Sequence, residues 1–373
     1  MENKVLNKIK HSTNSGQTTP LGTEPNDECY TSMDTILEEL SIWAKLGKFE
    51  DKNIICPCDM DITIDNDEYE ICSITIKYKP FDVDIVANDV FSYVDSVEMI
   101  CFEKEHPVKK TIMLAENEIA DFLRNKVKCN FIRVFTQCAR RWGIKSITAS
   151  GYDPATSRGI KFQNVDYSKY DICVTNPPFS KYSEFMDCVI GKIDFIILAP
   201  FLNRVNPNVG LPLMLKQAYL GFNIHNNILF SNPTEENGFS GEKRVACDWI
   251  TSFLEAQIER NKEYANYNSN IKYEAYKDEF IVCENMTMRD GTHPIRVSSL
   301  FPTDYDGWMF ASVAVLDRLN QDEYEWYGTN FKKYYNTTCP QNNPFAHKTS
   351  DAMVKAVGSS FHGIVFRKII NNK

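Results

Sequence analysis

The chain has 373 residues, of which 43% are hydrophobic and 24% charged, so it is long enough for two domains or for one large domain with additions. It contains no run of 18 apolar residues, which excludes a membrane-spanning helix. Residues 1–26 are polar and lack the apolar core of a signal peptide, so we expect a flexible tail and a cytoplasmic protein.

The formal net charge of −9 would argue against a nucleic-acid partner if it were spread evenly, but it is not. Residues 59–106 hold 13 acidic residues against three lysines, so the rest of the chain is close to neutral. Residues 124–145 contain seven basic residues and no acid, and residues 331–373 contain seven basic residues and one acid. These two basic zones are compatible with a polyanionic partner, although each of them alone is equally well an ordinary solvated face.

The 12 cysteines are scattered singly through apolar segments. Only Cys56 and Cys58 lie close together, and no pair of CxxC motifs indicates a zinc site. We therefore expect buried, reduced thiols and no metal ion.

The first predicted elements are a helix over residues 31–46 and a short strand over residues 53–58 that ends at Asp59. The helix carries an apolar stripe, and Thr35 and Glu38 have the spacing of a capping box. From residue 62 to about residue 108 the chain is acidic and rich in strand-forming residues, which predicts a small antiparallel insertion.

The residues that follow alternate between helical patterns and short apolar strands. Helices are predicted over residues 115–126, 130–142, 183–189 and 211–220, and strands over residues 146–150, 171–175 and 194–199. This alternation predicts an α/β fold in which crossover helices connect the strands of a parallel sheet. Beyond residue 230 the alternation stops, so we place a second region of mixed elements there.

The strand over residues 171–175 runs directly into Asn176-Pro177-Pro178-Phe179. Pro177 disfavours helical backbone angles at Asn176, and each proline removes an N–H donor. The corner therefore presents carbonyl oxygens and the Asn176 side chain at the carboxyl end of a strand, where ligands bind in open parallel sheets. Phe179 offers a flat face to a planar ring. A plain strand-ending turn is the alternative interpretation.

Acceptors held side by side are suited to gripping the two hydrogens of an amino group. An exocyclic aromatic amine is a poor nucleophile because its lone pair is delocalised into the ring. Two acceptors favour a tetrahedral nitrogen whose lone pair is localised and directed at an electrophilic methyl group. The corner thus predicts methyl transfer to an amine by orientation and preorganised electrostatics, without a general base.

Asn-Pro-Pro-Phe at this place resembles the catalytic motif of amino-methyltransferases that use S-adenosylmethionine. An ordered series of segments resembles the EcoRI-type adenine-specific DNA methyltransferases in particular. The matching segments are DECYT (27–31), NIICPCD (53–59), CNFIRVF (129–135), SITASGY (146–152), VTNPPFS (174–180) and YDGWMFASVAVLDRLNQDEYEWYG (305–328). Methyltransferases of DNA, RNA and protein glutamine share the tetrapeptide, whereas the ordered set is more specific.

The resemblance implies an α/β fold with a Rossmann-like class I methyltransferase sheet, an acidic β-rich insertion and a C-terminal α+β region. It implies a catalytic domain over residues 27–230 with a family-atypical insertion over residues 62–128, and a target-recognition region over residues 231–373. The implied function is N6-methylation of adenine in double-stranded DNA, with the target base flipped out of the helix. The enzyme would be of the orphan type or would be paired with a cognate restriction endonuclease.

The resemblance also implies roles for individual residues. Asn176 and the carbonyl of Pro177 would hold the 6-amino group, Pro178 would complete the corner, and Phe179 would stack on the flipped adenine. The S-adenosylmethionine site would comprise Thr31, Cys58 and Asp59 at the methionine end, Tyr152 or Asp153 at the ribose, and Asp166 and Tyr167 at the adenine, with Asn176 beside them.

Basic side chains outside the motif are candidates for contacts with nucleic acid. They are Arg133, Arg140, Arg141, Lys243 and Arg244.

Two features depart from the family pattern. The segment CPCDMD after the first strand has no glycine, whereas most such enzymes have a glycine-rich loop that approaches the cofactor there. The family pattern also passes quickly from this strand to the segment that corresponds to CNFIRVF (129–135), whereas here the acidic insertion lies between them. The insertion is an accessory for recognition, an oligomerisation surface or a decorated loop.

Three alternatives to a DNA methyltransferase stay open. The first is an RNA adenine N6-methyltransferase, the second a catalytically silent nucleic-acid-binding relative that keeps the fold, and the third a purely structural α/β protein. The missing glycine loop favours the silent relative, and the intact Asn176–Phe179 corner argues against it.

Overall fold

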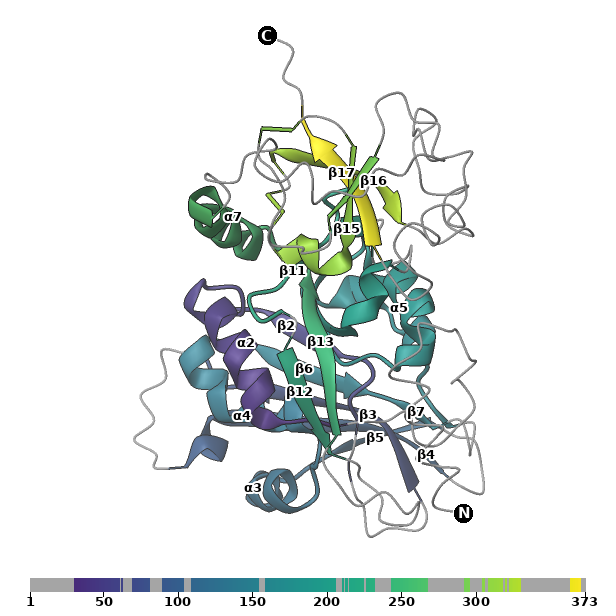
Figure 1. Ribbon diagram of the computed structural model, residues 1–373. Helices are drawn as coiled ribbons and strands as arrows, with labels where there is room; N and C mark the ends of the chain where they lie inside the picture. Colours follow the sequence, from purple (N-terminus) through teal and green to yellow (C-terminus); the bar gives the residue numbers. More distant parts are fainter. Residues whose placement is uncertain are drawn as a thin grey trace. The chain divides into compact units, whose positions relative to one another are not determined.

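The structure is a computed structural model of the whole chain (Figure 1). It describes residues 30–60, 62, 69–80, 89–103, 109–153, 158–205, 210, 212–213, 215–224, 226–231, 243–267, 292–295, 304–305, 308–317, 319–320, 322–329 and 363–369. The chain divides into two compact units. The first comprises residues up to Phe201 together with Gly221–Ser252, and the second comprises Leu202–Leu220 and the residues from Phe253 onward. Residues 221–252, which straddle the predicted boundary at residue 230, therefore belong to the first unit.

The first unit is built on one large sheet whose strands follow the order β1-β12-β13-β10-β9-β2-β6-β3-β4-β5. The bounds of these strands are Tyr30–Thr31 (β1), Asn53–Cys56 (β2), Tyr69–Tyr78 (β3), Val94–Glu103 (β4), Lys109–Met113 (β5), Ser146–Ser150 (β6), Ile172–Thr175 (β9), Asp194–Pro200 (β10), Asn226–Ser231 (β12) and Lys243–Thr251 (β13). The central strands β10, β9, β2 and β6 pair in parallel, and antiparallel pairs extend the sheet on both sides. The predicted mixed α/β class is confirmed.

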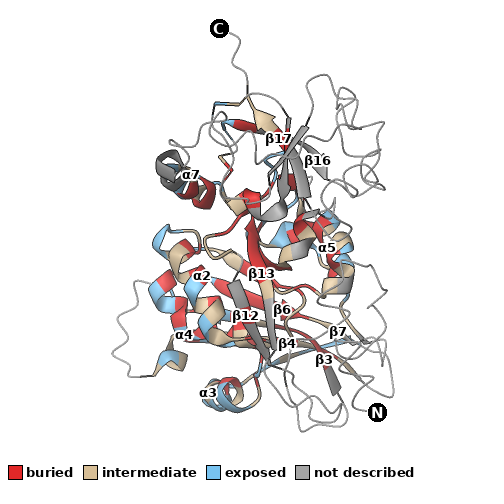
Figure 2. Ribbon diagram, viewed as in Figure 1, coloured by how far each residue is buried: buried red, intermediate tan, exposed pale blue. Residues whose placement is uncertain are grey.

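Helices cover both faces of this sheet. Figure 1 shows α2 (Met33–Lys45) beside α4 (Asn130–Trp142), with α5 (Tyr182–Val189) on the opposite side of the sheet. The central strands and the inward faces of these helices hold the buried core (Figure 2). None of the described helices is long and apolar enough to span a membrane.

The predicted bounds of α4 are confirmed; the helix buries one apolar face, and Gly143 ends it with a φ of 67°. The predicted capping box of α2 is wrong. Ser32 is the N-cap instead, and its hydroxyl accepts the Thr35 N–H at 3.2 Å. The cap lies three residues earlier because Thr35 is already inside the helix, where its own hydroxyl bonds with Ser32.

The acidic insertion is antiparallel, as predicted, but it does not form a separate sheet. β3 pairs with both β4 and β6, and β5 pairs with β4, so the insertion widens the main sheet at one edge. It also contributes η1 (Val90–Tyr93) and α3 (Glu116–Asn125). A β-bridge between Ile62 and Val127 joins its two ends.

The helix predicted over residues 211–220 is confirmed only at its start, since residues 212 and 213 are helical. Residues 215–218 form turns, and β11 is Tyr219–Leu220. Lys216 has a φ of 57°, a left-handed backbone conformation that a helix cannot continue. The amides of Gln217 and Ala218 both donate to the Pro212 carbonyl, at 2.8 and 3.1 Å, which closes the turn.

The second unit has a smaller sheet of order β14-β15-β17-β16, with bounds Thr292–Ile295, Trp308–Ser312, Gly363–Lys368 and Tyr324–Thr329 in that order, together with α7 (Glu255–Tyr267). Phe366 is fully buried in it and contacts the Tyr324 ring at a centroid distance of 6.0 Å. The fully buried guanidinium of Arg204 pairs with Asp317. A burial of this kind is tolerated because the charge is paired.

A candidate active site at the carboxyl edge of the sheet

The order of the parallel strands creates a topological switch point between β2 and β9. The chain passes from β2 to β6 on one side, and then returns to β9 on the other side of β2. Ligands in open α/β sheets bind at such a switch point, outside the carboxyl ends of the strands. Ile54 pairs with Ile172 and Ile55 with Cys173, so the residues that follow the two strands leave the sheet side by side.

The segments after β2 and β9 are joined by one carboxylate. Asp59 Oδ2 accepts a hydrogen bond from the Thr175 hydroxyl and a second one from the backbone N–H of Asn176, at 3.3 Å. Thr175 is buried, and Asp59 and Asn176 are half-buried. The link was not predicted from the sequence, and it brings two of the predicted site residues, Asp59 and Asn176, into direct contact.

The corner itself continues as a tight turn. Pro177 is buried, and Asn176, Pro178 and Phe179 are half-buried. The N–H of Lys181 donates to the Pro178 carbonyl at 2.9 Å, which begins the 3₁₀ turn η4 (Phe179–Lys181). The turn therefore uses the carbonyl of Pro178 rather than that of Pro177. The helix α5 follows at once, and the packing of its buried face fixes the exit of the corner.

The carboxyl end of β6 lies on the other side of the loop after β2. A Cβ atom on Gly151 would lie 3.1 Å from Cβ of Met60, so Gly151 lets that loop pack closely against β6. The hairpin β7–β8 (Tyr152–Asp153 and Arg158–Gly159) follows directly. The Lys161 ammonium lies 4.7 Å from the centre of the Tyr152 ring. The side chain of Asp153 is outside the described residues, so the choice between Tyr152 and Asp153 stays open.

Thr31 lies on a part of the sheet that projects past β10. Pro200 at the end of β10 pairs with Cys247, so the β13 residues before Cys247, and the β12 strand paired to them, extend beyond this end. Thr31 pairs with Phe230 on β12. Its carbonyl accepts the Asn130 side-chain amide at 2.9 Å, at the first residue of α4.

Asp166 has a hydrogen-bond partner and an ion-pair partner within the protein. Its carboxylate is exposed, accepts the Ser168 hydroxyl at 2.6 Å and pairs with Lys169 at 3.3 Å. These bonds hold the pKa of Asp166 below its ordinary value. Tyr167 is buried, and its hydroxyl donates to the Phe162 carbonyl at 3.0 Å. Burial raises the pKa of Tyr167, with a further contribution from the neighbouring thiols of Cys173 and Cys58.

The described cysteines confirm the prediction of reduced thiols, since all nine are free, seven of them buried. Cys58 is half-buried beside the corner. Burial raises its pKa well above the ordinary value, and the charge of Asp59 raises it further. The thiol is therefore neutral and weakly polar at neutral pH.

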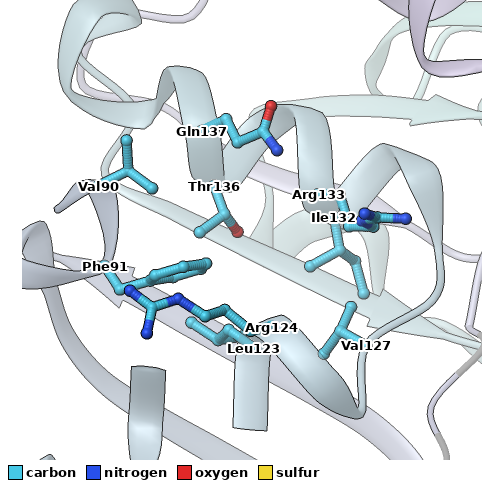
Figure 3. Close-up of a pocket in the computed structure, with 9 residues that line it drawn as sticks. All are labelled: Val90, Phe91, Leu123, Arg124, Val127, Ile132, Arg133, Thr136 and Gln137. Atoms are coloured by element: carbon cyan, nitrogen blue, oxygen red, sulfur yellow. The ribbon is translucent and has the colours of Figure 1, made fainter. Parts of the chain in front are cut away.

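The predicted nucleic-acid contacts Arg133, Arg140 and Arg141 are exposed on α4. The Arg140 guanidinium lies 4.2 Å from the centre of the Tyr93 ring, and Arg141 donates to Cys138 Sγ at 3.3 Å. Arg133 borders a shallow hollow of about 260 Å³ between η1, α3 and α4 (Figure 3). None of the residues that line this hollow belongs to the corner.

The backbones of Lys243 and Arg244 lie at the start of β13, opposite Phe230 and Leu229. They share with Thr31 the part of the sheet that projects beyond β10. Their side chains are outside the described residues. The assignment of all five basic residues to nucleic-acid binding stays a prediction.

Comparison with known families identifies the class of protein as an adenine-specific methyltransferase. The chain matches the family model described as "Adenine-specific methyltransferase EcoRI" over residues 22–373, nearly its whole length, and belongs to this family. The protein is therefore an enzyme that methylates adenine in DNA and uses S-adenosylmethionine as the methyl donor. The searches of curated proteins and of solved structures found no match.

Two buried hydroxyls fit the requirements of this cofactor. Thr31 Oγ1 and Ser150 Oγ are buried and have no hydrogen-bond partner within the described part of the chain. A buried polar atom without a partner is costly, and a bound ligand with many polar groups can satisfy it. Thr31 was predicted as a cofactor contact. Ser150 was missed, and the only signal for it in the sequence is a serine that ends an apolar strand next to a glycine.

Proposed function

We propose that the enzyme methylates the N6 amine of an adenine that is flipped out of double-stranded DNA, and that the corner Asn176–Phe179 is its catalytic centre. The observation that carries the proposal is the position of this corner: it stands at the switch point of the sheet and is bonded to the loop after β2 through Asp59. The strand order supports the assignment of a Rossmann-like class I methyltransferase sheet.

The corner orients the target amine and its adenine ring. Asn176 Oδ1 and the Pro177 carbonyl accept the two hydrogens of the target amine, which localises its lone pair. Phe179 stacks on the adenine ring and sets the plane in which the amine lies. An amine inside the duplex cannot reach such a corner, so the target nucleotide has to rotate out of the base stack. None of these groups has to exchange a proton for the methyl transfer itself.

S-adenosylmethionine supplies an electrophilic methyl group when it is bound. Thr31 at the end of β1, together with Cys58 and Asp59 after β2, would lie at the methionine end of the site. Tyr152 or Asp153 after β6 contacts the ribose, with the Ser150 hydroxyl buried beside them. Asp166 and Tyr167 would contact the adenine ring of the cofactor, and Asn176 would border the cofactor from the corner.

The second region, residues 231–373, recognises the target sequence, and the exposed arginines of α4 together with Lys243 and Arg244 contact the phosphates. Phosphate contacts of this kind position the duplex without reading its sequence. The enzyme acts in the cytoplasm, as an orphan or beside a cognate restriction endonuclease.

The test is transfer of labelled methyl from S-adenosylmethionine to unmethylated double-stranded DNA, with single-stranded RNA offered in competition. We expect label in DNA, at N6 of adenine after digestion to nucleosides. Asn176→Ala should lower turnover by about two to three orders of magnitude, as for loss of one preorganised polar contact. Label in RNA alone would identify an RNA methyltransferase. Absence of both cofactor binding and transfer would identify a catalytically silent relative.

A further inference from the structure

The loop after β2 and the corner after β9 meet where their two strands have stopped pairing. The ladder between them reaches no farther than Ile55 and Cys173. Beyond that point the Asp59 carboxylate links the two segments, since its Oδ2 accepts hydrogen bonds from both the Thr175 hydroxyl and the Asn176 N–H. One carboxylate oxygen thus holds the Thr175 side chain and the Asn176 backbone N–H, immediately before the prolines.

A carboxylate suits this position better than a neutral acceptor. Hydrogen bonds to an ionised acceptor are shorter and stronger than those between neutral groups. Pro177 and Pro178 carry no N–H, so the N–H of Asn176 is the last backbone donor before the two prolines. A shift of the Asn176 backbone would displace both proposed acceptors of the target amine.

We propose that Asp59 is a positioning residue for the catalytic corner, rather than a ligand of the cofactor. This inference rests on the proposed role of the corner. It assigns to Asp59 an effect on turnover, and it predicts that cofactor affinity depends little on this carboxylate.

A second aspartate joins the same two strands and provides a matched control. At their opposite ends, Asp171 Oδ2 accepts the backbone N–H of Asn53 at 2.7 Å and its side-chain amide at 3.1 Å. Asp59→Asn and Asp171→Asn therefore make the same chemical change between the same strands, at the carboxyl and amino edges respectively. Only the first change lies at the proposed active site.

The first measurement does not depend on activity. Amide hydrogen exchange in the free protein should be faster at Asn176 in Asp59→Asn than in the wild type, and unchanged there in Asp171→Asn. Calorimetry with S-adenosylmethionine should give a Kd within about twofold of the wild type for both variants. A tenfold or greater weakening in Asp59→Asn alone would make Asp59 a cofactor ligand and overturn the inference.

The second measurement is turnover at saturating cofactor. Asp59→Asn should lower kcat by about 10- to 100-fold, as expected for a small misplacement of reacting groups. Asp171→Asn should leave kcat unchanged. An Asp59→Asn enzyme with wild-type kcat and Kd would show that the link is only structural.

A second pair of variants keeps the test valid if Asp59→Asn does not fold. Thr175→Val removes one of the two donors at nearly constant volume, and Thr175→Ser restores it. We expect kcat to fall about tenfold in Thr175→Val and to return close to the wild-type value in Thr175→Ser. Equal kcat in the two variants would contradict the inference. A wild-type protein that transfers no methyl would refute the proposed function, while the exchange measurement would still test the Asp59 link.

Discussion

Glu39 on α2 accepts hydrogen bonds from both the backbone amide and the side-chain amide of Asn223, at 2.7 and 2.9 Å. The same carboxylate accepts the indole N–H of Trp43 at 2.7 Å and the Phe222 N–H at 3.0 Å. It is fully buried. Burial raises the pKa of Glu39, and the four donated bonds offset part of that effect. These bonds tie α2 to the segment that leads into β12.

Glu39→Gln should lower the free energy of unfolding by about 2–4 kcal/mol, because in either orientation the amide NH₂ would face two of the four donors that the carboxylate now satisfies. Urea unfolding of the two proteins measures the difference. Glu38→Gln, an exposed neighbour on the same helix, is the control and should change the stability by less than about 0.5 kcal/mol. Equal effects of the two substitutions would contradict this account.

Gly159→Ala should destabilise the hairpin that follows β6. Gly159 has a φ of 95°, and an added Cβ would lie 2.2 Å from the Gly151 carbonyl oxygen, which forces the backbone to move. We expect a loss of more than about 2 kcal/mol in stability. We also expect weaker binding of S-adenosylmethionine, since the hairpin carries Tyr152 and Asp153.

Gly191→Ala is the matched control for this prediction. Gly191 has a φ of 68°, but nothing lies within 4 Å of an added Cβ there, so the substitution carries only the backbone strain of about 1 kcal/mol. Thermal unfolding and calorimetric titration compare the two variants. A Gly159→Ala protein as stable as Gly191→Ala would show that the hairpin tolerates the displacement.

The protein should lose stability as the pH rises above about 9. Burial and the charge of Asp59 raise the pKa values of the Cys56, Cys58 and Cys173 thiols well above their ordinary value of 9.0. In the unfolded chain these thiols ionise near pH 9, whereas in the folded protein they stay protonated, so ionisation favours the unfolded state. Their contribution is therefore fully present below about pH 9 and is lost as the pH increases.

Thermal unfolding at a series of pH values between about 7 and 10 measures this loss. Cys173→Ala removes one of these three thiols, and its Tm should fall less over the same interval. A Tm that is constant or rises above pH 9 would show that the thiols do not control alkaline stability.

Phe179→Ala should weaken productive binding of DNA by about 1–3 kcal/mol, the usual contribution of one base stacked on an aromatic ring. The KM for DNA, measured at saturating cofactor, reports the change. Phe91→Ala is the control, because Phe91 is also half-buried but lines the hollow beside α4. Identical kinetics for Phe179→Ala and the wild type would remove Phe179 from the target-base site.

Much of the first unit could be predicted because its signals are local. The apolar stripe of α4 repeats at helical spacing within one element, and the bounds 130–142 agree with the structure. The strand over residues 146–150 is likewise bounded by polar residues and a glycine. The corner Asn176–Phe179 was predicted from the stiffness of its prolines, and the structure places it at the end of β9.

The contacts that organise the site could not be predicted, because they join distant parts of the chain. Asp59 and Thr175 are 116 residues apart, and no pattern near either residue marks the other. The pairing of β3 with β6 is also long-range, so the insertion looked separate from the main sheet. Local competition explains the smaller errors: Ser32 takes the cap of α2 instead of Thr35, and Lys216 interrupts the helix expected at 211–220.

The contact between Gly151 and Met60 bears on the missing glycine-rich loop after β2. Here the glycine, Gly151, follows the neighbouring strand β6, and the larger residue, Met60, lies on the loop, so the two residues pack directly against each other. The identities of residues 60 and 151 should therefore depend on each other: the contact is with Cβ of Met60, so a side chain at 151 requires glycine at 60 or a shift of the loop by a few tenths of an ångström. In sequences of this type, a search for the loop's glycine has to include the end of the next parallel strand.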